Sequence, residues 1–505
     1  MTTWTIRRFG EPNTKAPLWL KRLRRLSSRI RKRILGWRSN DSFVRPDVRP
    51  VLKRKEDGVE LYRALTQFEL EDALIGSLVA RYFRKQLEPY FDSASLAFRA
   101  PMSGPPPTHH DAVERIIEFQ THTHSGKSGS PLWVAEVDIR GFFDSVVHAV
   151  VRNSLREIAK TSNVDLDGRA HLVLDSYLAC YSFNEYGRAA AFELAVQESQ
   201  SDSIAVPWPE EELKELGVDV HGEPVGVPQG GALSCFIANL VLHFADAAVR
   251  TAGVRSSEYL YLRYCDDIVI VTRDKDSCHI LLDAYLRALR DLKLPSHPTT
   301  AFDGRSYLSG DAPFFWKSKS KEPFAWADPR VMEGAVPWCS FVGYQLRWDG
   351  ILRVRPASLK KAVAKHRDIR RTVAERVVGA RARKPPAKTL PDRQILFRTR
   401  QKLRSTAVGT TLLHLGATPS AICWAGGFRL LRKHGNPILR RQLRMLDRHK
   451  CRQLRRLRRA LKKHPNSLPP LKALTDERIA KYDGRPYSYH AIADPKDGDT
   501  TGNKS

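Results

Sequence analysis

The sequence is short of the residues that build disulfide scaffolds, zinc ribbons and membrane spans. Only seven of its 505 residues are cysteine, and no two of them form a C-x-x-C pair, so a zinc knuckle or ribbon is not expected. The odd, scattered set is typical of reduced cytosolic thiols. There is no run of 18 apolar residues, and the N-terminus lacks a continuous apolar signal segment. We therefore expect a cytoplasmic protein without a membrane span.

Acidic residues are also scarce relative to basic ones. Asp and Glu total 55 whereas Lys and Arg total 84, which gives a formal net charge of +29. Such an excess favours a polyanionic partner, and nucleic acid is the first candidate, although charge alone does not separate it from a merely basic soluble protein. The 42% apolar content is sufficient for a substantial core, and the length indicates two to four structural units.

Helical periodicity marks both ends of the chain. Residues 15–38 place Leu and Ile at helical spacing among Arg and Lys. This pattern predicts a basic amphipathic helix that docks on RNA, lies on a membrane surface or covers the core. Residues 59–91 carry a second, long helical pattern. Residues 355–465 are helical in pattern and rich in Arg, which favours a surface that follows phosphates over a merely solvated helix face.

The most informative segment is YLRYCDDIVIV, Tyr261–Val271. Aromatic and β-branched residues flank a central Cys-Asp-Asp, which predicts two antiparallel strands with Asp266 and Asp267 at their tight turn. Two adjacent carboxylates on a rigid hairpin repel each other in an apolar setting, and a divalent cation resolves that repulsion. The alternative is a solvated turn that happens to carry two acids.

A second acidic position follows a buried strand. In WVAEVDIRGFFDSV, Trp133–Val146, the apolar residues fall on one face of a strand over 132–139 and Asp138 lies on the other. A carboxylate at the end of a buried strand needs a partner, and a metal shared with Asp266 would provide one. Asp144 comes six residues later, and we expect it to cap a helix.

The third segment is GVPQGGALSCFIANLVLH, Gly226–His243. Gly230 and Gly231 permit close approach of the backbone to a ligand, and Gln229 on the same loop is placed to touch a base or sugar. The apolar residues 232–249 that follow predict a buried helix. The polar, Pro-containing residues 197–224 before this segment are typical of a surface insertion.

In this order, the three segments resemble the palm motifs of reverse transcriptases. FFDS, PQGGALS and YCDD are similar to the bacterial branch that includes group II intron-encoded enzymes, although Cys265 stands where many relatives have Ala and Cys235 where intron enzymes usually have Pro. CSFVGYQL, Cys339–Leu346, is similar to the later primer-grip segment. Leu96–Ile116 resembles a degraded fingers segment. The resemblance covers roughly residues 60–355.

The resemblance implies an α+β right-hand polymerase fold. Fingers and palm, built from an antiparallel sheet and helices, would be followed by a helical basic thumb. The expected divisions are a basic N-terminal extension (1–55), the fingers and palm (56–350), a helical thumb or RNA-binding region (351–465) and a partly disordered C-terminal tail (466–505).

The resemblance also implies a two-metal site. Asp138, Asp266 and Asp267, with the backbone carbonyl of Ile139, would hold two Mg²⁺ ions. One ion would lower the pKa of the primer 3′-hydroxyl, and the other would neutralise the triphosphate and the leaving pyrophosphate.

Further residues follow from the same resemblance. Phe143 matches the steric gate that excludes a 2′-hydroxyl, so it implies deoxynucleotide substrates. Gln229, Gly230 and Arg63 would contact the incoming nucleotide. Relatives carry a general-acid Lys shortly after the acidic hairpin, and the segment DLKLPSHPTT, Asp291–Thr300, lacks it at the expected place. His297 and Lys293 are the nearest substitutes.

The expected function is RNA-directed DNA synthesis from dNTPs, with an RNA template and a DNA primer and product as partners. The C-terminal region lacks paired cysteines and clustered acids, so neither a zinc-associated nuclease nor a ribonuclease H is expected. With its divergent fingers, the chain then resembles the defence-associated, "unknown group" reverse transcriptases. This resemblance implies a domesticated enzyme of bacterial anti-phage defence that uses a dedicated non-coding RNA. A group II intron maturase-like RNA-binding protein, a retron-type enzyme and an inactive RNA-binding scaffold are the alternatives. The sequence leaves the template, the priming mode and the oligomeric state open.

Overall fold

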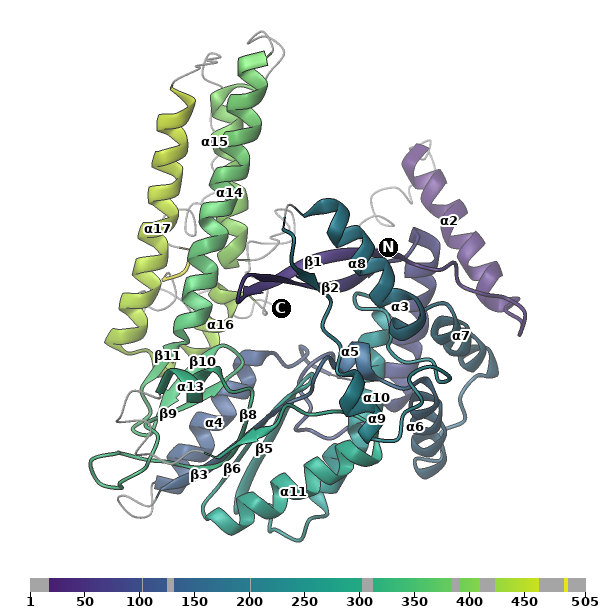
Figure 1. Ribbon diagram of the computed structural model, residues 1–505, viewed down its shortest axis with the longest axis vertical. Coiled ribbons are helices and arrows are strands. Elements are labelled where there is room, and N and C mark those ends of the chain that lie inside the picture. Colours follow the sequence, from purple (N-terminus) through teal and green to yellow (C-terminus); the bar gives the residue numbers. More distant parts are fainter. Residues whose placement is uncertain are drawn as a thin grey trace, which may run out of the picture.

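The computed structural model describes residues 18–101, 103–124, 131–199, 201–301, 312–383, 390–408, 423–462 and 486–488. The expectations for the first 17 residues and for most of the C-terminal tail lie outside these ranges. A central sheet forms the base of the molecule, and long helices rise from one end of it (Figure 1).

The central sheet has the strand order β5-β6-β3-β8-β7. Neighbouring strands run antiparallel, except that β7 and β8 are parallel. The two central strands consist almost wholly of buried residues, which explains their near-continuous apolar sequences. The strands are β3 (Leu132–Asp138), β5 (Tyr259–Tyr264), β6 (Asp267–Thr272), β7 (Thr299–Thr300) and β8 (Ser320–Trp326).

A helical layer covers one face of this sheet. Its centre is α10 (Ala232–Arg250), which packs against α3, α6 and α11 and confirms the predicted buried helix. Among the described residues, α10 alone has the length and apolar composition of a membrane span, but most of it is buried inside the protein. The surrounding helices are α3 (Leu70–Leu87), α6 (His148–Thr161), α7 (Gly168–Ala179) and α11 (Lys275–Asp291).

A basic hairpin stands above the sheet. β1 (Asp47–Glu56) and β2 (Val59–Gln67) pair antiparallel, and β4 (Ile204–Ala205) adds a short parallel strand to β2. Helix α8 (Arg188–Glu198) packs on β1 and β2. The predicted N-terminal helix is α2 (Leu18–Leu35), which docks on α3 through the ion pairs Arg29–Glu71 and Arg33–Asp72.

A second core joins α4 (His109–His124) to a small sheet and to the C-terminal helices. The small sheet has the order β11-β10-β9, with β9 (Trp338–Phe341), β10 (Tyr344–Arg347) and β11 (Leu352–Val354). The helices are α14 (Pro356–Arg383), α15 (Asp392–Val408), α16 (Trp424–Leu430) and α17 (Pro437–Leu461). Short elements complete the description: η1 (Glu88–Tyr90), α5 (Phe142–Ser145), η2 (Phe183–Gly187), α9 (Glu210–Glu215), α13 (Ala312–Lys317) and η4 (Leu431–His434).

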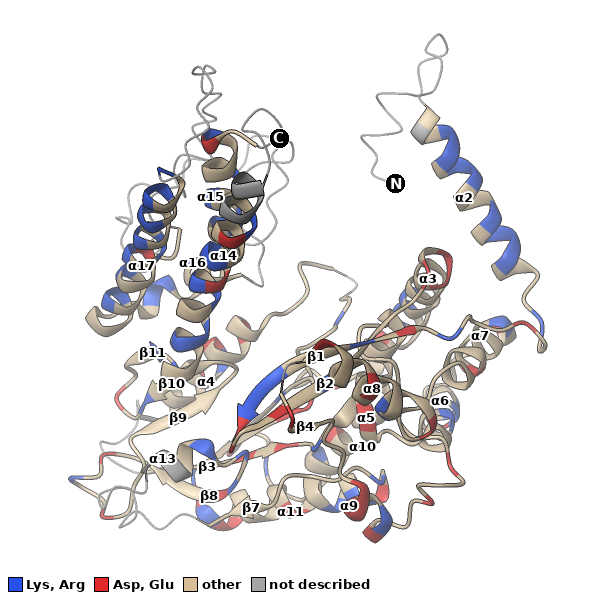
Figure 2. Cartoon of the chain, turned by 45° about the horizontal axis from the view of Figure 1, so that its top comes forward, with Lys and Arg blue, Asp and Glu red and all other residues tan. Residues whose placement is uncertain are grey.

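Helix α17 has the two faces that the sequence indicates. Leu443, Leu446 and Leu457 are buried against the other C-terminal helices. Figure 2 shows Lys and Arg along the outside of α17 and α15, and again along α2. The C-terminal tail returns to this bundle at one described point, where the Asp447 carboxylate accepts hydrogen bonds from the backbone N–H groups of Tyr487 and Ser488.

Three expectations need correction. The pattern over 59–91 is not one helix, because 59–67 is strand β2 and only 70–87 is helical. Within this helix Ile75, Val79 and Phe83 are buried, whereas Leu70 and Leu78 are exposed. An expected boundary after residue 55 would cut the β1–β2 hairpin.

The polar stretch 197–224 is not a detached insertion. Val206 packs under the hairpin beside α8, and Leu213, Val218 and Val220 form a small buried cluster with Val147 and Val225. The few apolar residues of the stretch are therefore the ones that fix it to the body of the protein.

Candidate active site

Two neighbouring strands bring the three acidic residues together. Asp138 ends β3, and in the β3–β6 register it lies directly opposite Asp267, the first residue of β6. Opposed residues of antiparallel strands have Cα atoms about 5 Å apart. Asp266 precedes Asp267 in the turn of the β5–β6 hairpin. The structure therefore places Asp138 beside the acidic turn, with Cys265 and Asp266 at its tip and Asp267 already in the strand.

The acidic cluster carries unfavourable electrostatics. Burial, followed by the charge of Asp138, raises the pKa of Asp266. Burial, followed by the charges of Asp266 and Asp138, raises the pKa of Asp267 to about 7. Each carboxylate thus opposes ionisation of its neighbour, which is the situation that a bound cation relieves.

The donor set fits a divalent cation. Carboxylate oxygens and backbone carbonyls are the protein ligands that Mg²⁺ prefers. No three His, Cys, Asp or Glu side chains within the described ranges form a ready-made metal cage. Instead the Lys319 ammonium forms an ion pair with Asp138 and partly offsets the repulsion. Ile139, the remaining predicted ligand, is buried directly after β3 and bridges to Ser296.

The two predicted proton donors lie in different places. The backbone N–H of His297 donates to the Asp138 carbonyl at 2.9 Å, and its ring Nε2 lies 3.9 Å from Asp138 Oδ2. Burial lowers the pKa of His297 to about 4, so the ring is neutral near pH 7. Lys293 lies outside the site, since its ammonium donates to the Gly217 carbonyl at 3.1 Å.

Lys319 is the cation that the sequence reasoning missed. It comes just before β8, whose Ser320 hydroxyl accepts a hydrogen bond from the Asp138 backbone N–H at 3.1 Å. The pairing of β8 with β3 therefore sets Lys319 beside the carboxylates. No local motif marks this residue, because 181 positions separate it from Asp138.

Asp144 and Gln229 form a second polar pair near the acids. Helix α5 begins at Phe142, so Asp144 lies inside it and is not the predicted cap. Gln229 Nε2 donates to Asp144 Oδ1 at 2.7 Å. Burial raises the pKa of Asp144 to about 7, while this hydrogen bond and the charges of Arg63 and Lys53 act against the rise.

The loop that carries Gln229 is tied to the basic hairpin. The Gln229 carbonyl accepts hydrogen bonds from the Thr66 backbone N–H at 2.8 Å and from its hydroxyl at 3.0 Å. Gly230 has a φ of +113°, and a Cβ there would lie 3.1 Å from the Thr66 carbonyl. A Cβ on Gly231 would collide with the Tyr177 hydroxyl. Close packing within the protein therefore accounts for both glycines, where the sequence suggested approach to a ligand.

Two basic residues of the β1–β2 hairpin act electrostatically on the acidic residues of the site. Arg63 is opposite Val51 in the hairpin register, on a strand rather than on the expected helix, and it is exposed. Burial, followed by the charge of Arg63, lowers the pKa of Lys53, whereas Asp138 acts in the opposite direction. Lys53 therefore lies within the field of both Arg63 and the carboxylates. The sequence reasoning missed it, although the Asp57-Gly58 turn, with both φ values positive, is a hairpin signal.

Phe143 directly precedes Asp144 in the sequence and is half-buried. Its ring centroid is 5.2 Å from that of Phe142, and its carbonyl accepts a hydrogen bond from the Val227 backbone N–H at 2.7 Å. The loop before Gln229 thus holds the backbone of this predicted gate residue.

The chain matches a known enzyme family over its central region. The family described as "Reverse transcriptase (RNA-dependent DNA polymerase)" matches residues 73–299, a range that contains all three acidic residues, Phe143 and Gln229. The chain contains a reverse transcriptase domain. The enzyme class is RNA-directed DNA polymerase, and members of this family generally use divalent metal ions. The predicted α+β class is confirmed, because the match to this family coincides with a fold of helices packed on largely antiparallel sheets.

Solved structures of telomerases are similar in outline. Apo telomerase from Candida tropicalis gives a TM-score of 0.41 at 11% identity, over 94% of this chain and 67% of that one. The same enzyme in complex with a TWJ fragment of telomeric RNA gives 0.40 at 13%, over 93% and 62%. Telomerase from Candida albicans in complex with such a fragment gives 0.35 at 12%, over 84% and 64%. A search of curated protein sequences finds no match.

Proposed function

We propose that this protein synthesises DNA from dNTPs on an RNA template by a two-metal mechanism. The observation that carries the proposal is the register that sets Asp138 opposite Asp267, beside Asp266, with the ionisation of both hairpin acids opposed by burial and by neighbouring charge. Asp138, Asp266 and Asp267, with the Ile139 carbonyl, would hold two Mg²⁺ ions. When bound, these ions supply a lowered pKa for the primer 3′-hydroxyl and neutralise charge on the triphosphate.

The surrounding residues suit the incoming nucleotide. Lys53 lies within the field of Asp138, and both Lys53 and Arg63 act on Asp144. These two cations would bind the triphosphate, since cationic groups stabilise the charge that develops during phosphoryl transfer. Gln229, fixed by Asp144 and Thr66, would contact the sugar or base. Phe143 would exclude a 2′-hydroxyl.

We propose Lys319 as the proton donor for the leaving pyrophosphate, in place of Lys293 and His297. An ammonium ion carries the proton that a general acid must give up, whereas the His297 ring is neutral near pH 7. Lys319 also lies at the acidic cluster, where Lys293 does not.

We propose a cytoplasmic role in bacterial anti-phage defence, with a dedicated non-coding RNA as template or primer. The exposed arginines of α17 and the lysines and arginines of α2 supply surfaces for such an RNA. A group II intron maturase-like protein and a retron-type enzyme remain the alternatives. Sequencing of the RNA and DNA that co-purify with the protein separates these roles, because an intron, a retron RNA and a short defence RNA differ in length and structure.

Primer extension tests the chemistry. Purified protein given a DNA primer on an RNA template, Mg²⁺ and dNTPs should extend the primer, and ribonucleotides should be used far less well. Failure of the wild-type protein to incorporate dNTPs would remove the polymerase proposal. Equal use of ribonucleotides would remove only the assignment of Phe143. Phage plating with and without Asp266→Asn tests the defence role, which requires that the variant lose protection.

A further inference from the structure

A fully buried arginine lies beneath the acidic turn. Arg263 belongs to β5 and has no exposed surface. Its guanidinium forms a two-pronged ion pair with Asp246 of α10, with Nη2–Oδ2 at 2.6 Å and Nε–Oδ1 at 2.8 Å. Asp246 is equally buried and also accepts a hydrogen bond from the Tyr261 hydroxyl at 2.6 Å. The pair occupies both prongs of the guanidinium on the side that faces α10.

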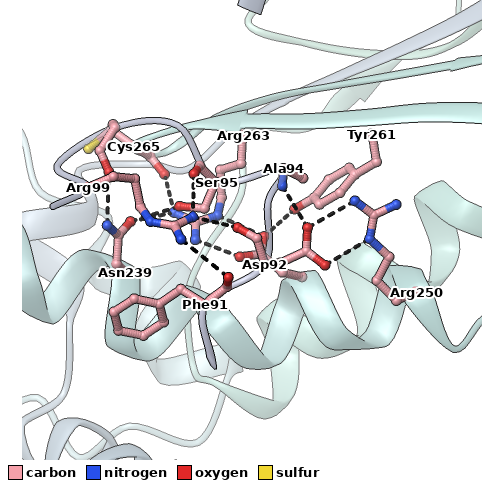
Figure 3. Close-up of polar contacts among 12 residues, drawn as sticks. Phe91, Asp92, Ala94, Ser95, Arg99, Asn239, Arg250, Tyr261, Arg263 and Cys265 are labelled. Atoms are coloured by element: carbon pink, nitrogen blue, oxygen red, sulfur yellow. Dashed lines mark hydrogen bonds and ion pairs between the residues drawn. The ribbon is translucent and has the colours of Figure 1, made fainter. Parts of the chain in front are cut away.

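The third nitrogen of Arg263 reaches the turn (Figure 3). Nη1 donates to the carbonyl of Cys265 at 3.1 Å and to Asn239 Oδ1 at 3.2 Å. Asn239 is fixed in turn, because its Nδ2 donates to the Ala97 carbonyl at 2.8 Å and its Oδ1 accepts from the Ser95 hydroxyl at 3.0 Å. The guanidinium is therefore locked in place before it contacts the turn.

The carbonyl that it holds belongs to a strained residue. Cys265 has a φ of +63°, in the left-handed region that non-glycine residues rarely adopt. Asp266 follows directly, so the Cys265 peptide sets the direction in which the Asp266 carboxylate points. A hydrogen bond to the Cys265 carbonyl holds this peptide in its strained conformation.

Stability alone does not require this arrangement. A buried ion pair is often no more stabilising than a well-packed apolar pair of the same volume. A guanidinium is planar and rigid, so two of its nitrogens can donate to one carboxylate while the third nitrogen donates to another group. A lysine ammonium cannot reproduce this fixed geometry. Here that remaining N–H is directed at the turn.

We infer that Arg263, locked by Asp246 and Asn239, is a positioning residue that holds the Cys265–Asp266 turn in its metal-binding shape. It touches no substrate and acts through Asp266. The inference rests on the proposed function, because it concerns the geometry of the proposed metal site. It adds that the ligand geometry is set by a charge network in the core and not by the hairpin alone.

The chain offers a matched control for the test. Arg250, at the end of α10, also forms a two-pronged pair with an aspartate, since its Nε and Nη2 lie 2.8 and 2.9 Å from the oxygens of Asp92. It makes no hydrogen bond to the turn that the structure describes. Arg263→Lys and Arg250→Lys are thus the same chemical change in two two-pronged pairs. The Arg250 pair is partly exposed, whereas the Arg263 pair is buried and is the one that reaches Cys265.

Primer extension by both variants, with Mg²⁺ and dNTP each titrated, gives the readout. We expect Arg263→Lys to lower kcat and raise the Mg²⁺ concentration for half-maximal rate, each by about 10- to 100-fold, while the KM for dNTP changes less than about threefold. Arg250→Lys should leave all three within about threefold of wild type. Asn239→Ala should shift the same two quantities as Arg263→Lys in the same direction, by less.

The outcomes separate the inference from the function on which it rests. If wild type extends primers and a folded Arg263→Lys protein keeps a normal Mg²⁺ requirement, the inference is overturned. If Arg263→Lys does not fold, as judged by circular dichroism, a normal Mg²⁺ requirement in Asn239→Ala overturns it instead. If wild type itself extends no primer, the proposed function fails.

Discussion

The two hairpins that face each other across the site are built in opposite ways. The β5–β6 hairpin is buried along both strands, carries acids at its turn and is supported from below by Arg263, Asp246 and Asn239. The β1–β2 hairpin is largely exposed, carries bases and turns at Asp57-Gly58. The first presents charges in a fixed geometry, and the second presents them on a surface that solvent reaches.

This difference suggests a division of labour. Metal ligands must converge within a narrow range of distances, and burial with a supporting network provides such precision. A triphosphate is large and flexible and can be met by long cationic side chains. We therefore expect substitutions in the acidic hairpin to act on the rate of chemistry and substitutions in the basic hairpin to act on nucleotide affinity.

The largest effect should come from the acids. Asp266→Asn and Asp138→Asn each keep the side-chain volume but remove a charge that the proposed metal ions would need. We expect each to lower the rate of primer extension by roughly 10³-fold or more, equivalent to about 4 kcal/mol of transition-state stabilisation. Single-turnover extension at saturating dNTP measures this.

Asp276 offers the control for that prediction. It is an exposed acid in the first turn of α11, close in sequence but outside the site. Asp276→Asn should extend primers at the wild-type rate. A residual rate above about a tenth of wild type in the Asp266→Asn protein would contradict the assignment of the metal ligands.

The basic hairpin should give an intermediate effect of a different kind. Arg63→Gln and Lys53→Gln each remove a cation that would bind the triphosphate. We expect the KM for dNTP to rise about 10-fold and kcat to fall by less, because one partly exposed charge contact contributes about 1–2 kcal/mol. Steady-state extension over a range of dNTP concentrations separates the two constants.

Arg54→Gln tests whether position on the hairpin matters. Arg54 is exposed on the same strand but pairs with Glu56 near the turn. Its substitution should leave the KM unchanged. A fall in kcat without a rise in KM for the Lys53 or Arg63 variants would erase the proposed contrast between the hairpins.

The same contrast explains what the sequence could and could not predict. The acids stand in strands whose apolar residues indicate burial, so the hairpin followed from local pattern. The convergence of Asp138 with the hairpin followed from the order of the motifs and the resemblance that they carry. The basic strand, with Lys53, Arg54 and Lys55 in a row, has no such alternation, and residues 59–67 fit a helical pattern although they form a strand. Exposed strands give weak patterns because no face of them must be apolar.

The roles of the remaining site residues could not be predicted from local sequence, because they depend on contacts between segments far apart in the chain. Lys319 reaches Asp138 only because β8 pairs with β3, and the role of Arg263 depends on Asp246 and Asn239 of a helix packed beneath the sheet. The prediction for Asp144 was wrong for a different reason. A polar residue at this place is typical of a helix cap, but a single turn of helix begins two residues earlier and places its carboxylate inside the protein.

The smallest effect, and the one that extends the comparison furthest from the site, concerns α17. Its arginines are exposed like those of the basic hairpin and would bind backbone phosphates rather than the reacting nucleotide. Replacing Arg448, Arg452 and Arg455 with Gln should weaken RNA binding and reduce the dependence of log Kd on log salt by up to about 0.7 for each single-strand phosphate that is no longer neutralised. The rate at saturating template should change little. As a control, Gln substitutions at Arg287 and Arg290, which are exposed on α11, should change neither the RNA affinity nor its salt dependence. An unchanged salt dependence in the α17 variant would mean that the basic face of α17 is only solvated.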